Sequence, residues 1–336
     1  MQVGFTLDFR NAPDRRRPWK EFWEDGLWLM GEAEAMGFDA LLIQEHFFTE
    51  DGYAPSMPIF LTLLAERTRR ARIGAYLYIL PLQNPARIAQ ETAVLDHLCG
   101  GRLDVTVGIG HRAAEYTAFG LNPRTRPSRM EEALEVLRLA WTGEPFDFDG
   151  RHFQYRGVQV QPAPLQRPHP PLWGGATTPV AAERAGRHGM HLHGVSADPA
   201  VPGAYREALA AAGHDPGAFR VSNPWSVTVT DEDPEEVWRR NRELYFYRWD
   251  FYRRIRQEMG DPDLAYGLEP SPEQYRDNEL IGDAPRVLAG LEPLVRGLEL
   301  TDLVLFGPAS GIDARGEGYA SLKRFADQVL PTLKSW

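Results

Sequence analysis

An alternation of short apolar runs and amphipathic segments extends through most of this 336-residue chain and restricts the fold it can adopt. Apolar runs of this length predict parallel strands buried on both faces, and the segments between them predict crossover helices. The predicted strands cover residues 2–7, 39–43, 71–77, 103–107, 172–173, 190–194, 219–229 and 302–306. Eight strands, each followed by a helix, favour a (β/α)8 TIM barrel with insertions, built as one domain over residues 1–336. A doubly wound sheet is the alternative, but it rarely uses so many units.

Two other segments interrupt the alternation. Residues 146–155 predict a β-hairpin with a turn at Asp149-Gly150. The polar, proline-bearing stretch from about residue 260 to 280 predicts an insertion, which is usually a lid or a disordered segment. Ser128 is expected to cap the helix that ends near Trp141.

Composition excludes several classes of function. The net charge of -10 argues against nucleic-acid binding, and no apolar run approaches the ~20 residues that a membrane span needs. Cys99 is the single cysteine, which excludes an intrachain disulfide and fits a reducing cytoplasm. Residues 1–7 lead directly into a strand, so we expect no signal peptide. Without a His-Glu-x-x-His motif or a cysteine cluster, we also expect no metal site.

The residues that could carry chemistry follow the predicted strands, where barrel enzymes place their active sites. Glu45 and His46 come directly after the strand that ends at Ile43. As a functional pair, His46 would be a general acid or base and Glu45 would orient or tune it. The structural alternatives are a buried core histidine and a salt bridge from Glu45 to an arginine.

Glycines follow two other predicted strands. Gly108-Ile109-Gly110 would allow close approach of a flat or anionic ligand, or would form a simple turn. The stretch from Gly174 to Thr178 lies between a predicted strand and a helix. Glycines and hydroxyl groups at a helix N-terminus favour a phosphate site, with a structural tight turn as the alternative.

Six aromatic residues lie between positions 245 and 252 of the long helix predicted to begin at Pro234. They cover every face of that helix, so core packing explains most of them and the others could line an apolar substrate pocket. Trp249 and Tyr252 are our choices for the pocket.

With these features, the chain resembles the bacterial luciferase-like flavin monooxygenases. The matching stretches are spread in order along nearly the whole chain. They are Glu45 to Glu50; Leu80-Pro81 with Asn84 to Arg87, Glu91, Leu95-Asp96 and Gly101-Arg102; Gly108, Gly110, Glu115-Tyr116 and Phe119-Gly120; Trp141 to Gly143; Pro162, Pro164 and Pro168 to Pro171; Gly174-Gly175; and Ile281-Gly282.

The resemblance implies a (β/α)8 barrel that holds FMN at the carboxyl ends of its strands, with His46 serving acid–base chemistry near the flavin ring. The Tyr76–Leu77 peptide aligns with a cis bond that presses on the ring in the family. The phosphate would meet Gly175, Ala176, Thr177 and Thr178, and the ring would lie near Tyr76, Leu77, Gly108 and Gly110. Phe47 and Tyr78 are our own choices for contact with the substrate.

The sequence departs from luciferase at three of these positions. Gly108 stands where luciferase has a reactive cysteine, Ile109 where it has an arginine, and Phe47 where it has a second histidine. Light emission is therefore not implied.

The activity implied by the resemblance is that of the oxygenase half of a two-component system. Reduced FMN from a separate reductase would react with O2 to give a peroxyflavin that oxygenates a small organic substrate. A homodimer built on the helices after the second and third strands is also implied. The alternatives are a deazaflavin-dependent hydride-transfer enzyme, a non-catalytic flavin-binding protein, and an unrelated lyase or hydrolase on the same barrel. The sequence leaves the substrate and the reductase undetermined.

Overall fold

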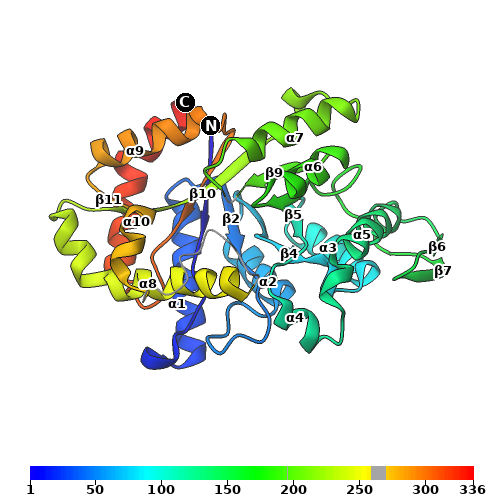
Figure 1. The fold of residues 1–336 in the computed structure, drawn as a ribbon, viewed down its shortest axis with the longest axis horizontal. Helices are drawn as coiled ribbons and strands as arrows, with labels where there is room; N and C mark the ends of the chain where they lie inside the picture. The colour runs from blue at the N-terminus through cyan, green and yellow to red at the C-terminus, as the bar shows by residue number, and fades with distance from the viewer. Residues whose placement is uncertain (195, 259–269) are drawn as a thin grey trace. The chain divides into compact units, whose positions relative to one another are not determined.

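The computed structural model describes residues 1–194, 196–258 and 270–336, which belong to two compact units. The first unit contains residues 1–41, 49–53 and 222–336, and the second contains residues 42–48 and 54–221. Strand β2 (Ala40–Ile43) begins in the first unit and ends in the second. Figure 1 labels the helices and strands of both units. The single domain predicted over residues 1–336 stays a prediction.

The first unit has a parallel sheet in the order β11–β10–β12–β1. Phe306 pairs in register with Thr6 on one side and with Ser226 on the other, so the carboxyl ends of β1 and β12 lie level beside β10. The elements of this unit are β1 (Gln2–Thr6), α1 (Trp19–Ala35), β10 (Val221–Val229), α8 (Pro234–Glu258), β11 (Glu279–Gly282), α9 (Ala284–Gly297), β12 (Asp302–Phe306), α10 (Glu317–Gln328) and α11 (Leu330–Ser335).

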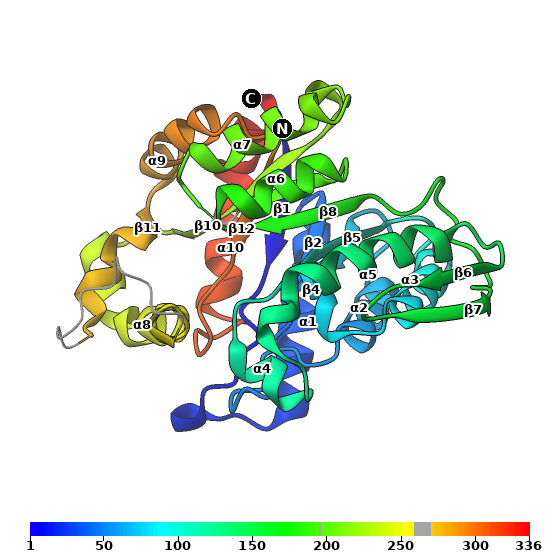
Figure 2. The ribbon, with the colours of Figure 1, turned by 45° about the vertical axis from the view of Figure 1, so that its right-hand side comes forward.

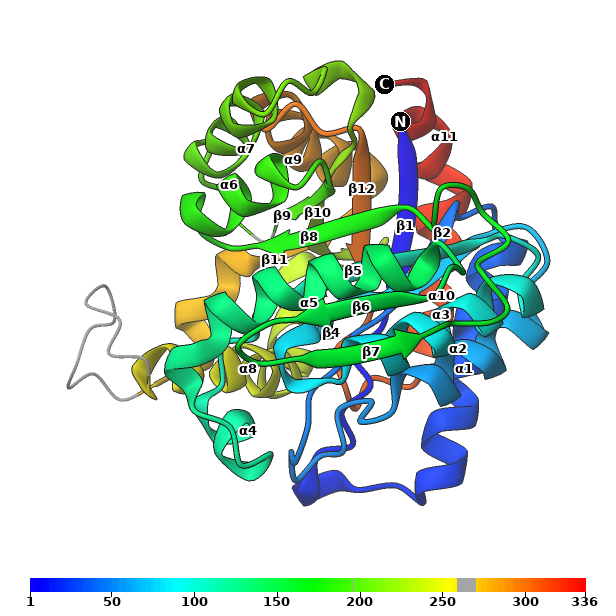
Figure 3. The same cartoon turned by 90° about the vertical axis from the view of Figure 1, so that its right-hand side faces the viewer.

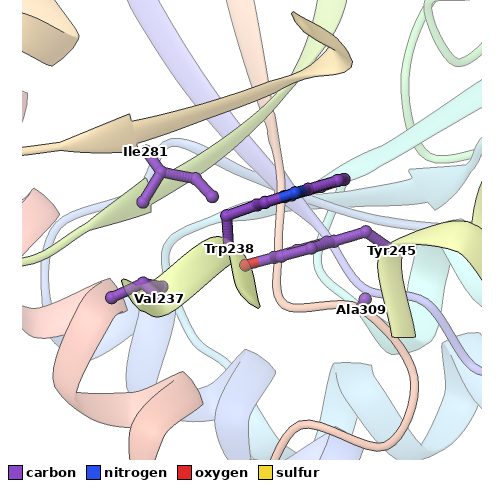
Figure 4. Close-up of a cluster of buried hydrophobic side chains, with 5 residues drawn as sticks. All are labelled: Val237, Trp238, Tyr245, Ile281 and Ala309. Carbon is purple, nitrogen blue, oxygen red and sulfur yellow. The ribbon is translucent and has the colours of Figure 1, made fainter. Parts of the chain in front are cut away.

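Helix α8 packs on this sheet through aromatic side chains (Figure 4). Trp238 and Tyr245 are seven positions apart and therefore lie on one face of the helix. Their rings stack with centroids 5.6 Å apart and an interplanar angle of 3°. Ile281 of β11 and Ala309, which follows β12, complete the cluster.

The second unit has a parallel sheet in the order β3–β5–β8–β9, with β4 also paired to β5. Trp173 of β8 pairs with Thr106 on one side and with His191 on the other. The elements of this unit are α2 (Met57–Arg67), β3 (Arg72–Ala75), β4 (Tyr78–Ile79), α3 (Pro85–Leu98), β5 (Leu103–Gly108), α4 (Ala113–Ala118), α5 (Arg126–Trp141), β6 (Phe146–Asp149), β7 (Gln154–Val158), β8 (Leu172–Ala176), α6 (Pro179–Arg187), β9 (His191–Gly194) and α7 (Ala200–Ala211).

Helices α6 and α7 lie side by side along β8 and β9 (Figure 2). Their close approach requires glycine, because a Cβ atom on Gly174 would lie 2.7 Å from the Cβ of Ala185, and one on Gly186 would lie 2.5 Å from the carbonyl oxygen of Tyr205. The antiparallel hairpin β6–β7 lies beside α5 (Figure 3). No helix in the described ranges is long and apolar enough to cross a membrane.

Several predicted boundaries differ from the structure. Gly174 to Ala176 belong to strand β8 and not to the loop after it. Ser128 is not the helix cap, because α5 begins two residues earlier with Thr125 at the N-cap and a proline in the first turn. The hairpin connection spans residues 150–153, because Asp149 pairs with Gln154.

The predicted insertion of residues 260–280 lies partly outside the described residues, which exclude 259–269. Its second half is regular structure: residues Pro272–Asn278 form a 3-10 helix, and β11 follows immediately. Arg276 of the 3-10 helix forms a 2.7 Å ion pair with Glu235 of α8. The lid itself stays a prediction.

Candidate functional site

The second unit brings His46 against a buried carboxylate from a segment 69 residues further along the chain. His46 follows β2 and is 7% exposed, and its Nδ1 lies 3.1 Å from Oε1 of Glu115 on α4. The same oxygen accepts the backbone N–H of Phe47 at 2.9 Å and Nη1 of Arg112 at 3.3 Å. The other carboxylate oxygen, Oε2, is buried without a hydrogen-bond partner.

The contacts of Glu115 determine which nitrogen of His46 carries the proton. Burial alone would raise the pKa of Glu115, but the hydrogen bond and charge of His46, the Phe47 N–H and Arg112 together lower it. The carboxylate is therefore ionised and can only accept hydrogen bonds, so Nδ1 of His46 carries the hydrogen of this contact. The ring of His111 meets His46 edge-on with centroids 5.5 Å apart. Burial, together with repulsion from His46, lowers the pKa of His111 to about 4, which keeps it neutral at pH 7.

Glu45 has a different environment from its neighbour in the sequence. Its Oε2 accepts the backbone N–H of Ile79 at 3.1 Å. Burial raises the pKa of Glu45 to about 8 despite that hydrogen bond, and the charges of Glu115 and Glu91 add to the increase. In the structure Glu115 is the carboxylate that orients His46. A tuning role for Glu45 stays a prediction. Tyr78, predicted to contact substrate, is 1% exposed and has a core position, where its hydroxyl has no partner.

The predicted flavin-ring residues meet around the side chain of Leu77. The Tyr76–Leu77 peptide bond is cis, as the resemblance implied. A Cβ atom on Gly108 would lie 2.7 Å from Cδ2 of Leu77, and one on Gly175 would overlap the same atom. Gly110 has a φ of +66°, and a Cβ there would lie 2.5 Å from Ile79. Glycine is required at these positions because the side chains of Leu77 and Ile79 lie directly against the backbone. We name Leu77, Gly108, Gly110 and Gly175 the glycine cradle.

The predicted phosphate residues lie at the start of α6, a nine-residue helix. Ala176 ends β8 and is buried, whereas Thr177 and Thr178 are exposed. Thr178 is the N-cap, and its hydroxyl accepts the N–H of Ala181. Because a helix N-terminus attracts anions, this end of the cradle fits the anionic tail of a ligand whose flat part lies against the glycines.

Comparison with known proteins identifies the family of this site. Residues 1–285 match the family described as luciferase-like monooxygenase. The chain belongs to the luciferase-like monooxygenase family. The flavin-dependent trigonelline monooxygenase oxygenase component of Acinetobacter baylyi is 25% identical over 99% of this chain and 96% of its own length. The F420-dependent glucose-6-phosphate dehydrogenase of Kineococcus radiotolerans is 31% identical over 90% of this chain and 91% of its own length.

The fold prediction is confirmed by a solved structure. Monooxygenase RslO1 from Streptomyces bottropensis superposes with a TM-score of 0.84, at 25% identity, over 99% of this chain and 100% of RslO1. The chain thus has the (β/α)8 barrel fold of the luciferase-like family. Matches to two uncharacterized proteins of Sinorhizobium fredii cover about half of each relative, 49% and 46%.

The two aromatic residues chosen on α8 belong to a buried polar cluster of the first unit. Trp249 donates its Nε1–H to Oε1 of Glu279 at 2.8 Å, and the hydroxyl of Tyr252 lies 2.9 Å from that of Tyr53. These bonds are structural, and contact with substrate stays a prediction for both side chains. Among the described residues no group of three or more His, Cys, Asp or Glu side chains could hold a metal ion.

The same cluster contains two fully buried arginines. Arg10 donates to both carboxylate oxygens of Asp8, at 2.6 and 2.7 Å. Arg248 donates to Asp8, to Ser226 and to the carbonyl oxygen of Gly307, and it lies 3.7 Å from Glu279. We name Asp8, Arg10, Arg248 and Glu279 the arginine cluster.

Sequence reasoning did not find the pairing of Glu115 with His46. Arg112, the N-cap residue of α4, also pairs with Glu115. The signal that could have found the histidine pairing is weak, because α4 has only six residues and no apolar period. The exposed side chains of Phe48 and Phe119 were also missed.

Proposed function

We propose that this protein is the oxygenase component of a two-component, FMN-dependent monooxygenase, which uses reduced FMN and O2 to oxygenate a small organic substrate. The observation that carries the proposal is His46, fixed in one tautomer by a buried carboxylate in the same unit as the glycine cradle. The trigonelline monooxygenase, matched over nearly its whole length, is flavin-dependent and is an oxygenase component, which supports a flavin cofactor and a separate reductase.

Bound reduced FMN would supply the electrons that activate O2. The chain would supply binding and proton handling. Thr177, Thr178 and the N-terminus of α6 would hold the phosphate, and the glycine cradle would admit the ring. Glu115 keeps the proton of His46 on Nδ1, so that Nε2 can accept a proton from the substrate or cofactor and return it. Glu45, with its pKa near 8, is mostly protonated at pH 7 and adds no charge beside the ring.

A second candidate, a deazaflavin-dependent hydride-transfer enzyme, is favoured by the dehydrogenase relative that uses F420. The two functions differ in cofactor and in their need for O2. We place either reaction in a reducing cytoplasm, on the basis of the single buried cysteine, Cys99.

The test is an anaerobic titration with reduced FMN, followed by rapid mixing with O2. We expect saturable binding, and we expect bound FMN to reoxidise at a different rate from free FMN. His46→Gln should change the rate of the O2 reaction or of substrate oxygenation by 10²-fold or more, the usual contribution of a general acid or base. His152→Ala is the control, because His152 bonds to Ser128 in the hairpin region. Binding of F420 without binding of reduced FMN would replace this proposal with the hydride-transfer enzyme.

We also propose a homodimer through α2 and α3. Ile59 and Leu63 of α2 and Val94 and Leu98 of α3 are 61%, 40%, 41% and 62% exposed, although all four are apolar. Exposed apolar faces of this kind mark protein interfaces. Leu98→Arg should halve the mass measured by light scattering, whereas Val180→Arg, on the equally exposed α6 surface, should leave it unchanged.

A further inference from the structure

Three phenylalanine rings contact one another in the second unit: Phe47 and Phe48, which follow His46 in the sequence, and Phe119, which follows α4. Phe47 and Phe119 meet edge to face, with centroids 5.1 Å apart and an interplanar angle of 89°. Phe48 lies 5.1 Å from Phe119 and 6.3 Å from Phe47. Phe48 is 63% exposed and Phe119 is 39% exposed. Large side chains so open to water, directly beside a fixed histidine, need an explanation other than core packing.

The segment that carries these rings is held firmly. The backbone N–H of Phe47 donates to Glu115, and its carbonyl oxygen accepts Nη1 of Arg112 at 2.9 Å. Phe48 has a φ of +54°, in the left-handed region that bulky residues rarely adopt. Such backbone strain persists only where the surroundings impose it, and it is concentrated at functional sites. The exposed ring of Phe48 is therefore a fixed feature of the surface.

The rings also connect to the glycine cradle through continuous apolar contacts. Ile79, Leu82 and Tyr116 form a buried cluster. Phe47 packs against this cluster, and so does Leu77, the side chain around which the cradle glycines gather. Phe47 and Leu77 thus pack on the same buried apolar cluster, which fixes the aromatic rings relative to the cradle.

We propose that Phe47, Phe48 and Phe119, the aromatic wall, bind an aromatic ring of the substrate and hold it beside His46. The inference rests on the proposed function and names its substrate class. Aromatic rings pair edge to face or offset-stacked at centroid distances of about 4.5–7 Å, an interaction that a saturated ring of the same size lacks. The open face of Phe48 and the fixed angle between its neighbours suit a flat ring better than a flexible chain.

The test uses 2-naphthol as the aromatic probe and decahydro-2-naphthol as its saturated counterpart. Their dissociation constants are measured by calorimetry on the flavin-free protein and on the protein loaded anaerobically with reduced FMN. We expect 2-naphthol to bind about threefold to tenfold more tightly than the saturated probe, the factor that aromatic pairing contributes. Phe48→Leu and Phe119→Leu should each remove most of that difference while keeping an apolar surface. Leu165→Ala, at a 49% exposed position between β7 and β8, is the matched control.

Two results would overturn the aromatic wall. Equal affinities for the two probes in the unaltered protein would show that the surface does not select aromatic rings. Unchanged preference in both leucine variants, confirmed as folded by circular dichroism, would show that these rings do not form the site. Failure of the proposed function has a different signature, because reduced FMN would then not bind to the unaltered protein, while probe binding to the flavin-free protein still tests the wall.

Discussion

The arginine cluster of the first unit and the His46 site of the second are both buried polar groups, but they differ in how completely they are hydrogen-bonded. In the arginine cluster, each guanidinium nitrogen of Arg10 and Arg248 donates to a carboxylate, hydroxyl or carbonyl oxygen. In the His46 site, Oε2 of Glu115 is buried without a partner.

The difference separates structure from function. Buried polar groups in native proteins are almost always paired, because an unpaired one costs about 1–3 kcal/mol. A fully paired cluster needs nothing further, and its loss should destabilise the fold. A site with unpaired atoms keeps capacity for a ligand or water, and its loss should change chemistry more than stability.

Arg248→Met gives the largest expected effect. Removing one guanidinium leaves the carboxylate of Asp8 with one fewer cation and takes a donor from Ser226, so we expect the free energy of unfolding to fall by about 3–5 kcal/mol. Urea denaturation measures the change. Arg254→Met is the control, because Arg254 is 56% exposed in its pair with Asp250 and should cost less than about 1 kcal/mol. If Arg248→Met also lowers the free energy of unfolding by less than about 1 kcal/mol, the arginine cluster does not stabilise the fold.

Glu45→Gln tests the pH dependence of a buried carboxylate without a cationic partner. The pKa of about 8 in the folded protein exceeds the ordinary glutamate pKa of 4.5, so the stability contributed by protonated Glu45 is present below pH 4.5 and is lost as the pH rises towards 8. Glutamine does not ionise, so the free energy of unfolding of the variant should rise relative to that of the unaltered protein by about 3–4 kcal/mol between pH 5 and pH 8.

Asp8→Asn should change the pH dependence of stability in the opposite direction to Glu45→Gln. The pKa of Asp8 is lowered, because although burial would raise it, Arg10 and Arg248 outweigh burial. Its stabilising contribution is therefore present above the unfolded pKa and is lost as the pH falls. Urea denaturation at a series of pH values measures the free energy of unfolding of both variants. If its pH dependence, relative to the unaltered protein, has the same sign in both, the two carboxylates do not differ as described.

Glu115→Gln should affect reactivity more than stability. The amide can no longer hold the Nδ1–H tautomer of His46, so we expect the rate of the O2 reaction or of oxygenation to fall roughly tenfold to a hundredfold, or about 1.4–2.7 kcal/mol. Nitrogen-15 NMR of the histidine should show a single tautomer in the unaltered protein and a mixture in the variant. Glu115→Asp should restore part of the tautomer preference. A pure Nδ1–H tautomer in the glutamine variant would mean that another group orients His46.

Phe48→Gly should give the smallest change in stability. Glycine relieves the left-handed backbone at this position but adds flexibility to the unfolded chain and removes the ring contact with Phe119. These terms oppose one another, so we expect the free energy of unfolding to change by less than about 1 kcal/mol, while the preference for 2-naphthol disappears. A loss above 2 kcal/mol in urea denaturation would assign Phe48 to the fold and not to the site.

Much of the fold was predictable because its signal is local. Apolar runs such as Leu41 to Ile43 and helices opened by proline, such as the one at Pro85, are specified by neighbouring residues. The same reasoning missed α4 and β11, which are short and lack a hydrophobic period. The predicted strand at residues 71–77 is divided into β3 and β4, with the cis peptide between them.

The site was predictable only in part. Position after a strand indicated His46, Gly108 and Thr178, because strand ends converge in a barrel. The sequence predicted that Glu45 orients or tunes His46, whereas the structure places Glu115 against Nδ1 of His46 and the backbone N–H of Ile79 against Glu45. Sequence spacing cannot show that Glu115 returns to His46, because that contact depends on the tertiary fold.

Glu115 also bears on how this protein can change over evolutionary time. One oxygen atom of this carboxylate binds the histidine, the backbone that carries the aromatic wall, and Arg112. A substitution there would alter proton transfer and wall geometry together, so selection should keep it fixed. The exposed rings of Phe48 and Phe119 do not hold His46 or Arg112 in place. New substrate preferences can therefore arise at these two positions one mutation at a time, on a reaction centre that is inherited intact.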